Sequence, residues 1–179
     1  ELYVKFGDAK KIYELLVDKG KDFNLSNCGM HSMDIMRMES GFLHWGHDIS
    51  PEENQYQAGL QFAISYKKNV DFIGKESLLK IKDKKDNKKF VMLVLNNSEP
   101  GEPLLLHDEP IYHFDNIIGR TTSGNYSFNF NKNLAFGYIN SELSKQDLAK
   151  AELYIEVEKK KYPASIILVP LNNKNIRSI

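Results

Sequence analysis

The stretch Arg37-Met38-Glu39-Ser40-Gly41-Phe42-Leu43-His44-Trp45-Gly46-His47-Asp48-Ile49 is the most informative part of the chain. It runs from the end of a predicted helix, over residues 29–40, into a loop rich in His, Trp and Asp. Gly41 stands where glycine commonly ends a helix. Residues 43–57 contain a glycine, a proline and many polar side chains, so we expect an irregular segment there.

Four of the five methionines fall within the predicted helix. Their unbranched thioether side chains fill irregular space, so core packing is the favoured interpretation and an adaptable binding face is the alternative. The four are Met30, Met33, Met36 and Met38.

The segment before this helix is predicted to hold a strand and a first helix. Leu2-Tyr3-Val4 indicates the strand, Asp8 is a suitable N-cap for the helix, and Gly20 is its expected stop. The apolar face of this helix consists of Ile12, Leu15 and Leu16. The chain starts at Glu1 without a methionine and enters the predicted strand at once, so we expect a piece of a longer protein.

Downstream of the loop, a strand is predicted over 58–66, with Leu60, Phe62 and Ile64 on one face. A third helix is expected near 75–84, and it ends in the charged run 82–89. Such a run is typical of a solvated connector. This run therefore marks the predicted domain boundary.

From Phe90 onward the pattern changes to short β-rich runs separated by turn signals. Many short strands at this spacing favour a small sandwich or barrel. One helical turn is expected near 143–149, with Ser144 as its cap. The predicted strands cover residues 90–95, 103–106, 110–114, 116–119, 134–140, 152–158 and 162–169, and one of the turn signals between them is Ser123-Gly124.

Bulk composition narrows the function classes. The 179 residues are 41% hydrophobic and 27% charged, as in globular proteins, and 24 basic residues balance 24 acidic ones. This balance argues against a nucleic-acid or anionic-membrane partner. Cys28 is the only cysteine, which excludes an intrachain disulfide and a Cys-based zinc site.

Six motifs occur in an order that resembles a known family. They are Glu1-Leu2-Tyr3, the stretch 37–49, Gln57-Ala58-Gly59-Leu60-Gln61-Phe62, Asp71-Phe72-Ile73-Gly74-Lys75-Glu76, Gly119-Arg120-Thr121-Thr122-Ser123-Gly124 and Leu134-Ala135-Phe136-Gly137-Tyr138-Ile139. Each is weak alone, but the six span essentially the whole chain. The chain resembles the glycine-cleavage T-protein (aminomethyltransferase) family. Within that family the Trp45–Ile49 loop favours the folate modules at the C-terminal end of dimethylglycine and sarcosine dehydrogenases.

The resemblance implies an α+β fold in two parts. Residues 1–87 would form the C-terminal part of an α+β folate-binding domain, and residues 88–179 a small antiparallel β-barrel domain. The implied boundary agrees with the one predicted from composition. FAD would belong only to a preceding N-terminal domain that this chain lacks.

The implied function is folate-dependent one-carbon transfer. A flavin-linked N-methylamine dehydrogenase would pass the oxidised methyl carbon to tetrahydrofolate, with folate, a small methylated amine and the remainder of the polypeptide as partners. The alternatives are a stand-alone aminomethyltransferase or folate-dependent demethylase, and a non-catalytic interaction module whose folate site has decayed. The implied location is the bacterial cytoplasm or the mitochondrial matrix.

The resemblance also implies which residues bind folate. Glu1 aligns with a glutamate that holds the pterin ring, where a carboxylate can accept two adjacent N–H bonds. Phe62 falls at an aromatic position near the folate, although a core phenylalanine explains it almost equally well. Trp45 and Tyr3 complete the candidates. The family's functional Asp lies upstream, so no catalytic residue is expected in this chain.

Two positions depart from the stand-alone T-proteins. Met33 replaces an Arg in the second helix, and a Tyr near the C-terminus is replaced around Ile176. Both departures weaken a strict aminomethyltransferase assignment and leave the dehydrogenase-like one intact.

Other polar clusters have simpler interpretations. His44, His47 and Asp48 have the spacing of metal ligands, but the family binds no metal there. We instead expect Asp48 to accept backbone N–H bonds in its loop, with Trp45 packed beneath it. A direct lining of the folate channel or of the domain interface is the alternative. Arg37 and Glu39 are expected to form an ion pair or to contact the barrel. For residues 121–124 we expect a β-turn, with ligand contact as the alternative.

Overall fold

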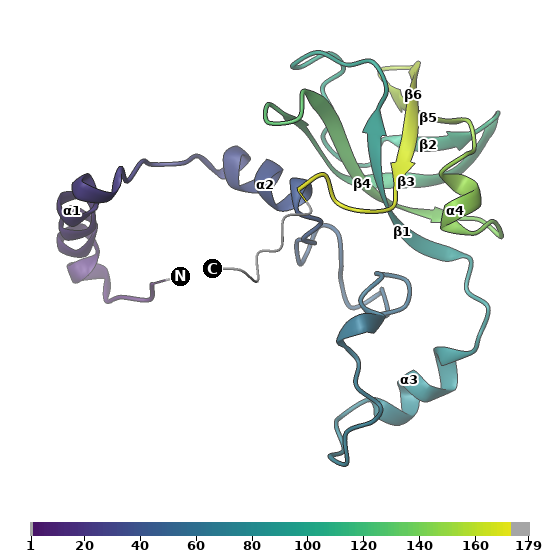
Figure 1. Ribbon diagram of the computed structural model, residues 1–179, viewed down its shortest axis with the longest axis horizontal. Helices are drawn as coiled ribbons and strands as arrows, with labels where there is room; N and C mark the ends of the chain where they lie inside the picture. The colour runs from purple at the N-terminus through teal and green to yellow at the C-terminus, as the bar shows by residue number, and fades with distance from the viewer. Residues whose placement is uncertain (1, 173–179) are drawn as a thin grey trace. The chain divides into compact units, whose positions relative to one another are not determined.

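The computed structural model describes residues 2–172 (Figure 1). The chain divides after Met33 into two compact units. The first unit contains the 3₁₀ turn η1 (Phe6–Asp8), helix α1 (Ala9–Gly20) and the turn η2 (Lys21–Phe23). Helix α2 (Met30–Glu39) begins in the first unit and ends in the second.

The first unit confirms the predicted helix but not the predicted strand. Helix α1 ends at Gly20 as expected, and Asp8 precedes it without making a side-chain capping bond. Residues 2–5 form no regular structure. A strand needs a hydrogen-bonded neighbour, and the described part of this unit supplies none. None of the residues of α1 is buried: Leu15 and Leu16 are exposed and Ile12 is half-buried.

The second unit is built on a closed antiparallel barrel with strand order β1-β4-β3-β2-β5-β6, and the predicted barrel is thereby confirmed. Figure 1 shows the strands curving round to close the sheet. The strands are β1 (Lys88–Leu95), β2 (Pro110–His113), β3 (Asn116–Ser127), β4 (Lys132–Asn140), β5 (Leu153–Val157) and β6 (Lys160–Ile167).

Two apolar clusters use opposite faces of the same strands. The barrel interior includes Leu93 of β1 and Ile139 of β4, both almost fully buried. Phe90 and Phe136 point to the other face of these strands and pack with Met38 of α2. Strands β1 and β4 are therefore covered on both faces, which explains their nearly continuous apolar sequence.

The helix ends agree well with the sequence, and most of the strands do too. Helix α3 spans Lys75–Lys82, and Ser144 caps α4 (Lys145–Leu148) by accepting a hydrogen bond from the Asp147 N–H. Strand β1 begins at Lys88, where the barrel was expected to start. The division of the chain into domains at that point stays a prediction.

Three local assignments in the second unit are wrong. Residues 58–66 form turns and the 3₁₀ helix η3 (Gln61–Ala63) instead of a strand. Residues 103–106 form no strand, although Leu105 is buried against the barrel core. Residues 121–124 lie inside β3, where the register shifts between Thr121 and Ser123, and not in a turn. Pairing with β4 outweighs the local turn preference of Ser-Gly.

The methionines of α2 also differ from expectation. Met38 is buried, whereas Met30, Met33 and Met36 are exposed. No helix within residues 2–172 combines the length and the apolar character that crossing a membrane requires.

Candidate functional site

The loop after α2 closes on itself through its own backbone. The His44 carbonyl accepts hydrogen bonds from the N–H groups of His47 and Asp48, and the Gly46 N–H donates to the Ile49 carbonyl at 2.8 Å. Gly46 has φ of +90°, a conformation that favours glycine. The loop is therefore a defined, hydrogen-bonded turn that carries Trp45, His44 and His47.

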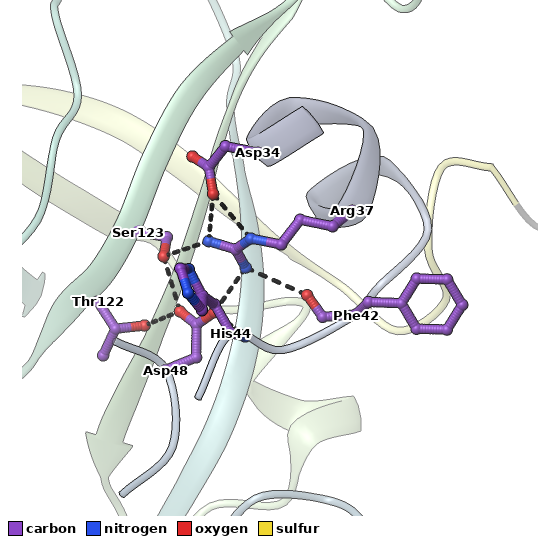
Figure 2. Close-up of polar contacts among 7 residues, drawn as sticks. All are labelled: Asp34, Arg37, Phe42, His44, Asp48, Thr122 and Ser123. Carbon is purple, nitrogen blue, oxygen red and sulfur yellow. Dashed lines mark hydrogen bonds and ion pairs between the residues drawn. The ribbon is translucent and has the colours of Figure 1, made fainter. Parts of the chain in front are cut away.

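Asp48 is the anchor of this loop, and it is only 1% exposed. One carboxylate oxygen accepts from the Arg37 guanidinium at 2.6 Å and from the His44 N–H at 2.8 Å. The other accepts from the hydroxyls of Thr122 at 2.5 Å and Ser123 at 2.8 Å. Figure 2 shows the Asp48 carboxylate together with the four residues that donate to it. Four donors on one buried carboxylate satisfy its acceptor sites.

Arg37 joins the helix, the loop and the barrel. Its Nε donates to Asp34 at 2.7 Å, one turn earlier in α2, and its Nη1 donates to the Phe42 carbonyl at 3.1 Å. Its Nη2 donates to Ser123 of β3 at 2.8 Å, as Figure 2 shows. The guanidinium also lies 5.7 Å from the ring centre of Phe136. The expectation of an ion pair and a barrel contact for Arg37 is confirmed.

Glu39 forms a second buried link between α2 and the barrel. Its carboxylate accepts from the Ser127 hydroxyl at 2.5 Å and from the Asn129 amide at 3.0 Å and 3.2 Å. Its backbone carbonyl accepts from the Asn172 N–H at 2.8 Å. The expected barrel contact of Glu39 is therefore present, and it is made to the neutral side chains of Ser127 and Asn129.

A third carboxylate, Glu53, pairs with Lys88 at the start of β1 at 2.6 Å. Burial raises the pKa of Glu53, but hydrogen bonds from Lys88 and Ser50 and the Lys88 charge outweigh it, so the pKa is lowered overall. Burial also raises the pKa of the Tyr138 hydroxyl, and the charges of Glu53 and Asp48 raise it further. That hydroxyl is buried and makes no hydrogen bond within residues 2–172.

The predicted folate-binding side chains are solvent-facing where the structure describes them. Trp45 is 65% and Phe62 79% exposed, both in the second unit, and Tyr3 is 89% exposed in the first. Glu1 lies outside the described residues. The assignment of these four residues to folate stays a prediction. Asp48 does accept a backbone N–H in its loop as expected, but the exposure of Trp45 contradicts the idea that it packs beneath.

The remaining sequence hypotheses concern Met33, Ile176 and a possible metal site at His44, His47 and Asp48. Met33 is exposed in the first unit, and Ile176 lies outside the described residues. The rings of His44 and His47 lie 4.6 Å apart, while the carboxylate of Asp48 is taken up by the four donors. Between residues 2 and 172 no three His, Cys, Asp or Glu side chains are grouped as metal ligands.

The roles of Thr122 and Ser123, whose hydroxyls hold the loop to β3, were not predicted from the sequence. Their signal is visible afterwards: Thr122 is the extra residue at the register shift of β3, and such a bulge lets two consecutive hydroxyl residues reach the same carboxylate oxygen. Asp34 was also missed, although its spacing three residues before Arg37 is that of a helical ion pair.

Two family models match successive parts of the chain. Residues 1–68 match the sequence model described as the GCVT N-terminal domain, and residues 88–172 match the glycine cleavage T-protein C-terminal barrel domain. The chain belongs to the glycine cleavage T-protein family. The resemblance inferred from the six motifs is confirmed.

Relatives within the T-protein family include long and short enzymes. The chain is 33% identical over 171 residues to mitochondrial dimethylglycine dehydrogenase of Rattus norvegicus, covering 96% of this chain and 19% of that protein. It is 34% identical over 142 residues to an aminomethyltransferase of Symbiobacterium thermophilum, covering 78% of this chain and 36% of that one. The chain thus spans well under half of the length of either relative.

A solved structure shares the T-protein fold. The glycine cleavage system aminomethyltransferase T from Bartonella henselae superposes with a TM-score of 0.75, at 24% identity, over 92% of this chain and 44% of that one. The similarity supports the fold described above.

Proposed function

We propose that this chain serves as the C-terminal folate module of a flavin-linked N-methylamine dehydrogenase of the dimethylglycine or sarcosine type. The observation that carries the proposal is the 33% identity to dimethylglycine dehydrogenase, which extends over 96% of the chain. The family relationship alone supports folate-dependent one-carbon chemistry. The assignment to a flavin-linked dehydrogenase is more specific and is our proposal.

The described residues fit a folate ligand in one respect. Trp45 and Phe62 each expose a large aromatic face in the second unit. Such faces can pack against the flat rings of tetrahydrofolate. When bound, tetrahydrofolate supplies the nitrogen nucleophiles that take up a carbon at the oxidation level of formaldehyde. Glu1 would hold the pterin by its carboxylate, as the family resemblance implies.

The chain's own contribution is binding and orientation. Asp48 and Arg37 hold the loop that carries Trp45, and they do so with buried, fully bonded side chains. Neither group is free to transfer a proton to a ligand. The module therefore acts by holding the carbon acceptor close to the site of oxidation, where proximity replaces strong acid–base groups.

The decisive experiment uses the full-length protein. We expect a visible flavin absorption band, and oxidation of dimethylglycine or sarcosine that releases less formaldehyde when tetrahydrofolate is present. A colourless protein with aminomethyltransferase activity would replace this proposal with the second candidate, which the 34% identity to an aminomethyltransferase favours. A protein that binds no tetrahydrofolate would support the decayed interaction module.

Substitution of the exposed aromatics tests the site itself. Trp45→Ala and Phe62→Ala should each weaken tetrahydrofolate binding about threefold to tenfold, from the loss of ring packing. Phe128→Ala is the matched control, because Phe128 is equally exposed but lies in the turn between β3 and β4. Equal effects of all three substitutions would remove Trp45 and Phe62 from the proposed site.

A further inference from the structure

A pocket of about 410 Å³ lies within the second unit, between the end of α3, the start of β1 and helix α4. Its lining is unusually basic and contains one carboxylate, Asp86. The other lining residues of note are six lysines: Lys82, Lys84, Lys85, Lys88, Lys89 and Lys145. The net charge of the whole chain is zero, so this cluster is a local concentration of positive charge.

The charges on the lining lysines are only partly compensated. Lys88 pairs closely with Glu53 at 2.6 Å. Lys85 reaches Glu142 at 3.7 Å, but both side chains are mostly exposed, so the pair is weak. Lys89 donates to two backbone carbonyls, at 2.6 and 2.8 Å, which satisfy its N–H groups without cancelling its charge.

The carboxylate in the lining is already engaged. Asp86 accepts from the Gln57 amide at 2.7 Å and from the Lys88 backbone N–H at 2.9 Å. It therefore caps the turn into β1 and forms no close ion pair with a lysine of the pocket. The single negative charge of Asp86 cannot neutralise six lysines, so the pocket keeps a net positive charge that solvent can reach.

Lys145 supports an anion in this pocket independently of the pocket's overall charge. It is the first residue of α4 and is partly buried, and it forms no ion pair or side-chain hydrogen bond within residues 2–172. Burial lowers the pKa of Lys145, and the neighbouring Lys89 charge lowers it further. A partly buried ammonium without a partner carries a desolvation cost that an anion would relieve. Lys84 on the same rim also lacks an ion pair among the described residues.

We propose that this lysine pocket binds a small multivalent anion, one that carries two or more carboxylate or phosphate groups. Each ammonium supplies three donors on a flexible stem, which suits groups of varied geometry better than one planar fork would. The spacing of Lys84, Lys89 and Lys145 around one cavity allows several anionic groups of one molecule to be met together. The proposal is independent of folate binding at Trp45 and Phe62.

The test measures anion binding to the full-length protein by isothermal titration calorimetry at low salt. The probes are citrate for carboxylates and pyrophosphate for phosphates, and their relative affinities distinguish the two chemistries. We expect binding of at least one probe, and progressive weakening with added NaCl because exposed charges are screened. No heat of binding with either probe would overturn the proposal.

Variants locate the site. Lys145→Gln and Lys84→Gln should each weaken the probe about tenfold through loss of a charged hydrogen bond. Lys145→Arg should retain most of the affinity. Lys68→Gln is the matched control, an exposed lysine outside the pocket. Lys84 is exposed, so its substitution leaves folding intact. An unchanged dissociation constant in both Gln variants, or an equal loss in Lys68→Gln, would overturn the assignment.

Discussion

The guanidinium of Arg37 and the carboxylate of Asp48 lie 2.6 Å apart, and their side chains are 14% and 0% exposed. Ser123 completes the link, because its hydroxyl accepts from Arg37 and donates to Asp48. Helix α2, the following loop and strand β3 are thus held by one buried charged network. A buried ion pair is sensitive to the loss of either partner, since the remaining charge is left uncompensated.

Asp48→Asn is expected to lower the free energy of unfolding by about 3 kcal/mol, because it leaves the Arg37 charge with only Asp34. Urea denaturation followed by the fluorescence of Trp45, the only tryptophan, measures the change at the loop itself. Asp115→Asn, at a fully exposed aspartate, is the control and should leave the midpoint unchanged. Similar stability of the two variants would show that the network is not important for folding.

Ser127→Ala should destabilise the junction between α2 and the barrel. The hydroxyl donates to the buried Glu39 carboxylate and accepts from the Phe130 N–H. Its removal leaves a buried charge with one donor fewer, at a cost of about 2 kcal/mol. Chemical denaturation measures this, with Ser165→Ala, whose hydroxyl bonds an exposed Asn96, as the matched substitution.

The stability contributed by Glu53 should depend on pH. Its pKa is lowered in the folded state, so its contribution is present above the unfolded pKa of about 4.3 and is lost as pH falls through the folded value. Glu53→Gln should therefore cost about 1 kcal/mol near neutral pH and progressively less below about pH 4. Unfolding curves of both proteins across this range check the sign. A cost that grows on acidification would contradict it.

Tyr138→Phe should leave stability unchanged or raise it. The Tyr138 hydroxyl is buried and has no hydrogen-bond partner among the described residues, so its removal deletes an unsatisfied polar group and retains the ring that packs on Phe90. Thermal unfolding measures the effect. A loss of more than about 1 kcal/mol would indicate that the hydroxyl is satisfied, for example by a buried water.

Two glycines should respond differently to alanine. At Gly119, a Cβ would lie 2.0 Å from the Tyr138 carbonyl oxygen of the adjacent strand, so Gly119→Ala must separate β3 from β4. At Gly46 there is open space, and only its positive φ opposes the change. We expect Gly119→Ala to cost more than about 3 kcal/mol and Gly46→Ala about 1 kcal/mol, by urea denaturation.

Much of the site's framework could be predicted, because its signals are local. Gly41 and Ser144 mark helix ends through backbone conformation and capping, which depend on only a few neighbouring residues. The expectation that Arg37 and Glu39 contact the barrel also held. Their exact partners could not be foreseen, since Arg37 and Ser123 are separated by 86 positions and meet only when β3 is paired.

The failures share one physical cause. Leu2–Val4 and residues 58–66 have strand-like sequences but find no neighbouring strand among the described residues, while Ser123-Gly124 has a turn-like sequence but is paired with β4. Strand formation is a property of pairs, so single-segment preferences decide it weakly.

The sequence by itself determined the family, the succession of helices and β-rich runs, and the barrel class, because periodicity, turn residues and motif order are written along the chain. Only the tertiary structure decided that Asp48 is a buried anchor and that, between residues 2 and 172, the Tyr138 hydroxyl and the partly buried Lys145 ammonium find no polar partner. Burial and hydrogen-bond partners arise from contacts between distant segments, and those contacts exist only once the barrel has closed.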